Sequence, residues 1–228
     1  MTKNESVYRE LQQHLDKQAV SYPAAKDGSD IRILKHIFDP DEAKLATFLS
    51  WEFQNIQEIQ NKVKGFDKSI IPDMLQKMLE KGGIEGHEKE GVRYYCNPPL
   101  VVGMYELQLF RLSKGFVRDF RRYTRSKEFG LSWLGTGASQ MRTIPIEKAV
   151  TVKHQVATFD QVDQLLDQAE GPFVIVPCIC REKSEIQGHS CKVTDRKETC
   201  LALGDTAQSI LLTKQGRTID REEARDIL

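Results

Sequence analysis

The sequence lacks three features that would place it in a broad class of proteins. Its 33 basic and 33 acidic residues leave no net charge, so no global field draws the chain towards nucleic acid. No apolar run approaches the roughly 20 residues that a membrane-spanning helix needs. The first residues, MTKNES, lack the apolar core of a signal peptide. We therefore expect a cytoplasmic protein with no segment inserted in a membrane.

The sequence also lacks residue patterns that would indicate a catalytic site of its own. The sequence has no recognisable general acid–base pair and no Ser-His-Asp arrangement, and Gly135-Thr-Gly137 is too short a pattern to assign a phosphate-binding loop. We predict no independent catalytic site, so an oxidoreductase role would here mean electron transfer. What the sequence does have is 228 residues with 39% apolar content, enough for one large or two small globular domains.

Cysteine is scarce but clustered. Four of the five cysteines, Cys178, Cys180, Cys191 and Cys200, lie within 23 residues of one another. In a cytoplasmic protein, such a group favours metal ligation over disulfide bonds. Cys96 stands apart on a predicted strand, where a small packed thiol is the expected role.

The residues before Cys178 predict where the first two cysteine sulfurs lie. Residues 173–176 form a β-branched and aromatic run between two prolines, which predicts a buried strand ending in a loop. In an extended loop, Cys178 and Cys180 point to the same side and face one centre. Two thiols placed in this way match the wide sulfur spacing of a [4Fe-4S] cluster better than the narrower spacing around tetrahedral zinc. Zinc and reduced structural thiols are the alternatives.

A helix predicted to follow Asp195 supplies the last ligand. Asp195 and Glu198 match a capping box that opens a helix over residues 196–213. Cys200 then falls near the first turn, where the positive end of the helix dipole favours a thiolate.

Two further residues are expected close to the cluster. Arg181 follows Cys180 directly and would stabilise the cluster's negative charge. His189 lies in the loop before Cys191, where it is either a surface residue or a hydrogen-bond donor to the cluster region.

The first 100 residues predict a helical region. Residues 1–38 supply two helices, and residues 39–100 supply three more helices and a hairpin, which is the order of a winged helix-turn-helix. Lys68, Lys77 and Lys81 could contact DNA, as could Gln76 and Arg93, but acidic residues surround them. A protein-interaction or structural role is therefore favoured over DNA binding.

A basic segment connects this region to the cysteines. Residues 104–127 predict a long helical segment, interrupted near Gly115, with seven basic and two acidic residues. Two interpretations are open: a solvated basic face over an aromatic core stripe, or a docking face for an acidic partner or nucleic-acid phosphate. The residues of the docking face would be Arg118, Arg121, Arg122 and Arg125.

The predicted architecture is α+β or α/β, in four segments. Residues 1–38 are N-terminal helices, 39–100 the winged helix-turn-helix, 101–135 basic connecting helices, and 136–228 a small α/β cysteine-cluster domain. In this last domain we expect strands at residues 141–146 and 149–153 and a helix from residue 158, with the ligands at the carboxyl end of a strand.

Several motifs of the sequence together resemble those of one known family. They are PCICRE (177–182), ETCLALG (198–204) and GRTIDREEA (216–224), with IRILKH (31–36), VVGMYE (101–106) and RTIP (142–145) further forward. With these motifs the chain resembles, over nearly its whole length, a family of anaerobe iron–sulfur proteins of the 4Fe-4S ferredoxin type, also called Fe–S oxidoreductases. In that family the chain usually continues into a ferredoxin-like segment with further cysteine clusters, which this sequence lacks.

The expected function follows from these features. The four clustered cysteines hold one [4Fe-4S] cluster, which exchanges single electrons with a redox partner protein. Two alternatives are a redox-sensing winged-helix transcription regulator and a structural zinc-binding subunit of an assembly.

Overall fold

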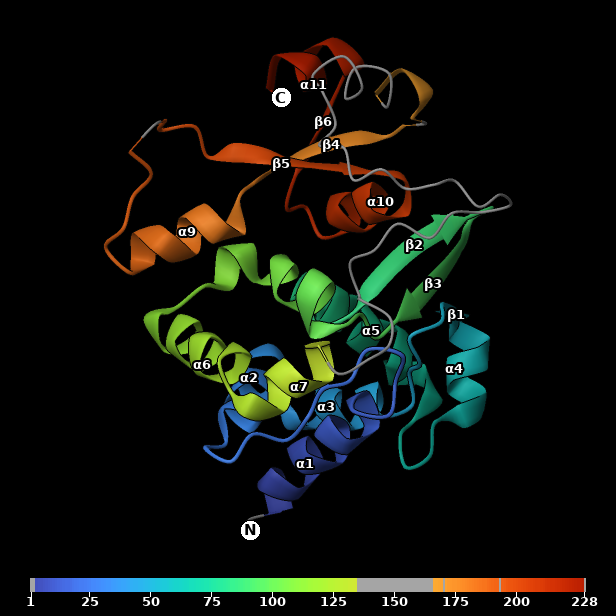
Figure 1. Ribbon diagram of the computed structural model, residues 1–228. Coiled ribbons are helices and arrows are strands. Elements are labelled where there is room, and N and C mark those ends of the chain that lie inside the picture. Colours follow the sequence, from blue (N-terminus) through green and yellow to red (C-terminus); the bar gives the residue numbers. More distant parts are fainter. Residues whose placement is uncertain (1–2, 135–165, 170, 193, 228) are drawn as a thin grey trace, which may run out of the picture.

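The computed structural model describes residues 3–134, 166–169, 171–192 and 194–227 (Figure 1). Across these residues the chain is a mixed α+β protein, in which helices accompany two antiparallel sheets of three strands each. The first sheet and the N-terminal helices lie together, and the second sheet lies beyond them with the C-terminal helices (Figure 1).

Three helices begin the chain: α1 (Lys3–Leu15), α2 (Ser29–Ile37) and α3 (Pro40–Ala46). Helix α3 begins directly after Asp39, with Pro40 in the first turn. The backbone N–H of Asp39 donates to Glu42 Oε2 at 2.8 Å, which is one half of the capping box.

The next helices and the first sheet also lie where the sequence predicts them. Helices α4 (Ile56–Lys62) and α5 (Ile71–Glu80) precede the hairpin of β2 (Glu85–Lys89) and β3 (Val92–Cys96). A two-residue strand that was not predicted, β1 (Gln54–Asn55), pairs with β3 and gives the order β1-β3-β2.

Residues 104–127 are largely helical, as predicted, but the interruption does not lie at Gly115. An irregular turn and a 3₁₀ helix, η3 (Glu106–Arg111), come first, followed by α6 (Lys114–Thr124) and α7 (Lys127–Leu134). The break lies at Ser113 rather than at Gly115, because Ser113 is extended and its Oγ accepts the N–H of Phe116 at 3.1 Å.

The second sheet has the order β5-β4-β6 and is antiparallel. Its strands are β4 (Phe173–Pro177), β5 (Glu198–Leu203) and β6 (Arg217–Ile219), with α9 (Ile179–Ile186), α10 (Gly204–Leu212) and α11 (Arg221–Ile227) between and after them. The strand predicted at 173–176 is confirmed. The strands predicted at 141–146 and 149–153 lie outside the described residues, as does most of the helix predicted from residue 158.

One hydrophobic core runs through the N-terminal helices, the first sheet and α6, and a smaller core lies under the second sheet. The two parts touch where α10 packs against β2. Just after α10, the Gln215 Nε2 group donates to the Leu107 carbonyl of η3 at 2.6 Å. Among the described residues, no helix combines the length and the apolar character required to cross a bilayer.

Candidate functional site

The pairing of β4 with β5 brings Cys200 next to the end of β4. In the register of β4 with β5, Cys200 lies opposite Val176, and Val176 is two residues before Cys178. The register shifts just after Val176, and the Cys178 N–H donates to the Lys197 carbonyl at 2.9 Å. Two cysteines that are 22 positions apart in the sequence therefore meet at one strand end.

Cys178 and Cys180 do not lie in an extended loop, as the sequence suggested. Cys178 is the N-cap of α9, and Cys180 lies in its first turn. The N–H groups of Arg181 and Glu182 both donate to the Cys178 carbonyl at 3.0 Å, which closes the first helical turn. The spacing argument that preferred a cluster to zinc assumed extended geometry, so it no longer applies.

The helix predicted over residues 196–213 is also wrong in its first half. Residues 198–203 form β5, and α10 begins only at Gly204. A strand here satisfies its backbone groups against β4, and the Glu198 carboxylate pairs with Arg217 of β6 at 2.8 Å. Cys200 therefore sits on a strand, and the helix N-terminus at this site belongs to Cys178.

The thiols near this strand end differ in acidity. Burial would raise the pKa of the Cys178 thiol, but hydrogen bonds from backbone N–H groups, led by that of Arg181, and interactions with the Cys200 and Thr199 side chains hold the pKa below its ordinary value. Burial and the facing Cys178 raise the pKa of Cys200, and burial and the charge of Cys178 raise that of Cys180. Of these three thiols, Cys178 is the one whose pKa is lowered.

Cys191 lies in the loop between α9 and β5 and is exposed. It lines a small surface hollow together with Arg181, Thr194 and Arg196. The structure therefore brings Cys178, Cys180 and Cys200 close to one another, with Cys191 on the adjoining loop. No disulfide joins any of these cysteines. Over the described ranges, no three His, Cys, Asp or Glu side chains are arranged as they stand to hold a metal ion.

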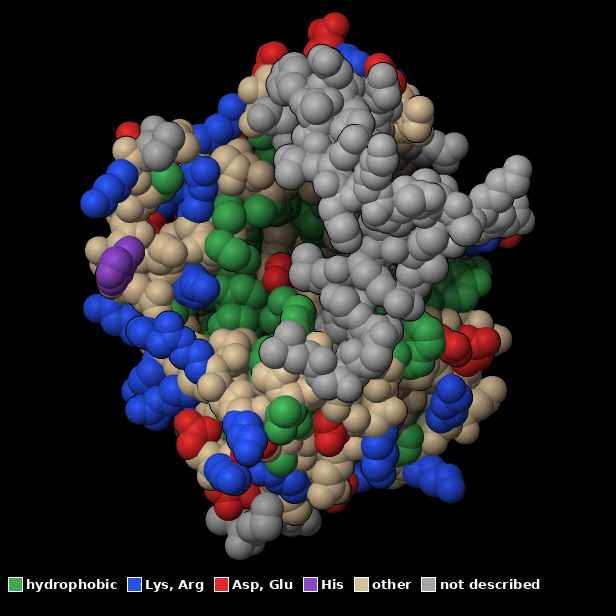
Figure 2. All heavy atoms as spheres, viewed as in Figure 1, with side chains coloured by type: hydrophobic (Ala, Val, Ile, Leu, Met, Phe, Trp, Pro, Cys, Tyr) green, Lys and Arg blue, Asp and Glu red, His purple; other side chains and the backbone are tan. Residues whose placement is uncertain are grey.

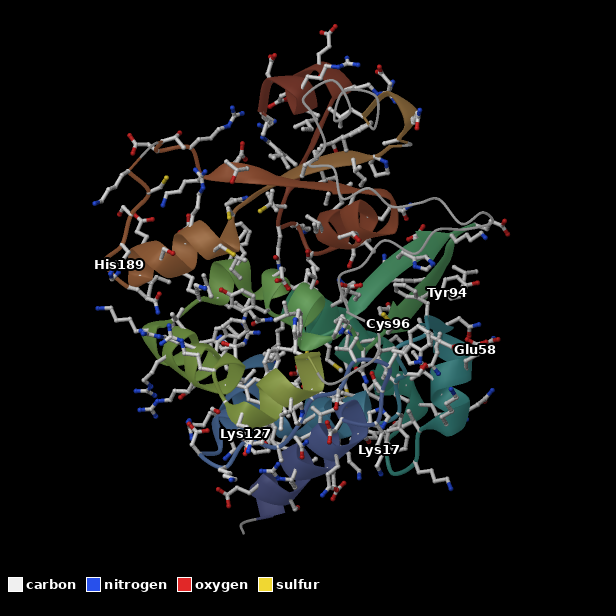
Figure 3. The ribbon with its side chains drawn as sticks, viewed as in Figure 1. Lys17, Glu58, Tyr94, Cys96, Lys127 and His189 are labelled. Atoms are coloured by element: carbon white, nitrogen blue, oxygen red, sulfur yellow. The ribbon has the colours of Figure 1, made fainter. Side chains whose placement is uncertain are left out.

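Arg181 and His189 differ in their distance from the thiols. Arg181 is close enough for its charge to favour the thiolate of Cys200, and its Nη1 donates to the Arg196 carbonyl at 2.6 Å. His189 lies past the far end of α9 and is exposed (Figure 3). Because eight helical residues span about 12 Å, His189 is not a neighbour of Cys178; it lies two residues before Cys191, on the loop that follows α9.

Sequence reasoning missed the groups of the N-terminal part that face the thiols. A cavity of about 80 Å³ has Cys200 and Ile179 on one side and Glu85 and Glu106 on the other. Burial raises the pKa of Glu106. The hydrogen bond that its carboxylate accepts from the Gly103 N–H at 2.6 Å acts in the opposite direction. Figure 2 shows apolar side chains around a hollow between the two parts, with an acidic side chain in it. The sequence signal for this group was Glu106, a carboxylate within the mainly apolar residues 100–109.

The predicted basic face is exposed on α6. Arg118, Arg121, Arg122 and Arg125 all reach solvent, and Arg118 pairs with Asp119 at 3.5 Å. Arg121 and Arg125 also line a groove of about 440 Å³ between α6 and α9, into which α9 contributes Lys183. The described residues that line this groove include no carboxylate, and Figure 2 shows Lys and Arg side chains gathered on this side of the molecule.

Three of the five residues considered for DNA contact are engaged with other side chains. Lys81 pairs with Asp39 at 2.6 Å and with Glu42 at 2.8 Å. Arg93 donates to the Gln76 side chain at 2.6 Å and pairs with Glu88 at 3.5 Å. These contacts neutralise part of the face that would meet phosphates.

Comparisons with protein-family models, with curated proteins and with solved structures found no match for this chain. The resemblance to anaerobe iron–sulfur proteins therefore has no support beyond the motifs themselves, and the function has to be argued from the site.

Proposed function

We propose that Cys178, Cys180, Cys191 and Cys200 hold one [4Fe-4S] cluster and that the chain exchanges single electrons with a partner protein. The observation that carries this proposal is that thiols from a helix start and a strand gather at the end of β4, with the fourth cysteine on the adjoining loop. Cysteine thiolates are the usual ligands of such clusters. A bound cluster would supply one-electron redox chemistry, for which these side chains alone are not suited.

The surrounding residues suit a negatively charged centre. The first turn of α9 directs backbone N–H groups towards the Cys178 sulfur, and these stabilise a thiolate. The positive charge of Arg181 acts on Cys200 in the same direction. On the opposite side, apolar residues such as Ile179 and Val176 limit the access of water to this region.

The basic groove supplies a docking face for the partner. Helix α9 carries Cys178 at its start and Lys183 in the groove that it shares with α6. An acidic protein bound along Arg121 and Arg125 would therefore lie beside the thiol site. We infer that the partner presents a carboxylate-rich surface.

We assign the region of α3, α4, α5 and the first sheet to a winged-helix arrangement that contacts protein rather than DNA. The order of three helices followed by an antiparallel hairpin supports this assignment. The ion pairs of Lys81 with Asp39 and Glu42 argue against a DNA-reading role.

Metal analysis of the anaerobically purified protein tests the proposal. We expect about four irons per chain and a broad absorption near 400 nm. Cys178→Ser should remove most of the iron and the absorption, because it removes one of the four proposed ligands, and the one whose thiolate the first turn of α9 stabilises. Cys96→Ala should leave both unchanged, because Cys96 is buried on β3 and takes no part in the site. Colourless protein that carries zinc, or equal iron loss in both variants, would overturn the proposal.

A further inference from the structure

Cys178 and Cys200 form a pair of thiols that meet across two strands. Cys178 follows β4 directly, and Cys200 is the third residue of β5. Val176 lies opposite Cys200 in the register, so Cys178 lies diagonally across the strand pair from Cys200. The Cys178 and Cys200 side chains are within hydrogen-bonding reach of each other. The fold therefore holds two sulfurs together that are far apart in the chain.

The backbone on both sides of this pair is held by the sheet. The Cys178 N–H donates to the Lys197 carbonyl at 2.9 Å, and Val176 and Cys200 are partners in the β4–β5 ladder. Neighbouring strands lie about 4.7–4.9 Å apart, and a disulfide joins Cα atoms that are about 4.4–6.8 Å apart. A bond between the two sulfurs is therefore compatible with the strand pairing.

The other three cysteines are placed less well for such a bond. Cys180 also approaches Cys178, but both lie at the start of one helix, where residues two apart do not face each other. Cys191 is exposed on the loop after α9, and Cys96 is buried on β3. Cys178 and Cys200 are both partly exposed, so a small molecule in solution can reach them.

We propose that the chain without a bound cluster reduces small disulfides through Cys178 and Cys200. The Cys178 thiolate, which the first turn of α9 stabilises, attacks one sulfur of the small disulfide, forms a mixed disulfide with it and releases the first thiolate. The Cys200 sulfur then loses its proton and attacks the Cys178 sulfur, which breaks the mixed disulfide and releases the second thiolate. In total the small disulfide gains two electrons and two protons, and the chain keeps one Cys178–Cys200 disulfide.

These steps use no metal, so the exchange itself does not rest on the proposed cluster. Its product acts on the same site, because a Cys178–Cys200 disulfide takes two of the four proposed ligands out of use. Disulfides that form in a reducing compartment are usually transient and either catalytic or redox-sensing. A site that alternates between a disulfide and a set of free thiols fits that pattern.

Reaction of the full chain with glutathione disulfide tests the proposal, after a chelator has removed any metal. The remaining thiols are alkylated, and peptide mass spectrometry identifies the linked cysteines. We expect a chain that carries no glutathione and has one link, between Cys178 and Cys200, and dithiothreitol should return it to the thiol form. Stable glutathione adducts without an internal link, or a dominant link that involves another cysteine, would overturn the proposal.

Two variants locate the reaction. In Cys200→Ser, the glutathione bound to Cys178 meets no second thiol from β5, so its release should slow by at least about tenfold. Cys96→Ala, which changes a buried cysteine away from the pair, should react like the wild type. Equal release rates in Cys200→Ser and the wild type would contradict the proposal. The link mapped in the unchanged chain decides the question even if Cys200→Ser fails to fold.

Iron loading separates this proposal from the proposed function, on which the effect on the cluster rests. The reduced chain should take up iron, and the oxidised chain should take up little until dithiothreitol is added. If the link forms but the reduced chain takes up no iron, the proposed function fails and the exchange stands. If iron binds but no link forms, the exchange fails and the proposed function stands.

Discussion

The two thiols that face each other at the end of β4 have different acidity because of their local backbone. Cys178 is the N-cap of α9, and backbone N–H groups of the first turn, led by that of Arg181, also lie close enough to its sulfur to stabilise the thiolate. Cys200 lies within a strand whose N–H groups serve the β4 ladder. The backbone around Cys178 therefore favours the thiolate form that binds a metal, whereas Cys200 keeps its proton until a metal binds.

Glu85 should make the stability of the protein depend on pH. Its pKa is raised from 4.5 to about 7 in the folded state. The folded state therefore holds its proton more tightly than the unfolded state, so this contribution to stability is present below about pH 4.5 and is lost as the pH rises through 7. Glu85→Gln should raise the free energy of unfolding at pH 8 by about 2 kcal/mol and change it little at pH 4.5.

Denaturant unfolding at both pH values measures this effect. Burial also raises the pKa of Glu106, which acts in the same direction and should preserve part of the slope in the variant. Glu88→Gln, at an exposed position, is the matched control and should change neither value by more than about 0.5 kcal/mol. A variant that is less stable than the wild type at pH 8 would contradict the account.

At the scale of elements, the end of α5 depends on a glycine. Gly82 has φ of +67°, and a Cβ built on it would lie 2.3 Å from the Leu107 carbonyl oxygen. Gly82→Ala should therefore cost more than about 3 kcal/mol, since it adds a backbone collision to the strain of a left-handed residue. Thermal and denaturant unfolding of the variant measure the loss.

Gly91 in the β2–β3 turn separates the two contributions. It has φ of +76°, but nothing lies within 4 Å of an added Cβ. Gly91→Ala should cost only about 1 kcal/mol, which is the strain alone. Equal losses in the two variants would show that the contact of α5 with Leu107 is not what makes Gly82 necessary.

At the scale of the whole molecule, a buried hydrogen bond joins the cysteine-bearing part to the N-terminal part. The Gln215 side chain donates to the Leu107 carbonyl at 2.6 Å, and Gln215 is 7% exposed. Gln215→Ala leaves that carbonyl buried without this donor and should lower the free energy of unfolding by about 1–3 kcal/mol.

Two probes would show whether the parts separate. Both tryptophans, Trp51 and Trp133, lie outside the second sheet, so their fluorescence follows the N-terminal part, whereas far-UV circular dichroism follows the entire chain. In the Gln215→Ala variant we expect the dichroism change to begin at a lower denaturant concentration than the fluorescence change. Gln57→Ala, at an exposed position on α4, should keep the transitions of the wild type.

The sequence by itself determined the elements whose signals are local. Asp39 with Pro40 defines the start of α3, Asp220 accepts the Glu223 N–H at 2.8 Å at the start of α11, and Gly82 follows the end of α5. Each signal involves residues within one turn of the chain, so the tertiary structure did not need to change it. The buried strand before Cys178 and the packed thiol of Cys96 were predictable for the same reason.

Only the tertiary structure decided the form of the cysteine site. Residues 198–203 carry a helix-start pattern, yet they form β5 because pairing with β4 satisfies more backbone groups than an isolated helical turn would. The same pairing carries Cys200 to Cys178, and the packing of α9 on η3 brings Glu106 towards the thiols. These are contacts between residues far apart in the chain, and no local pattern of the sequence encodes their distance.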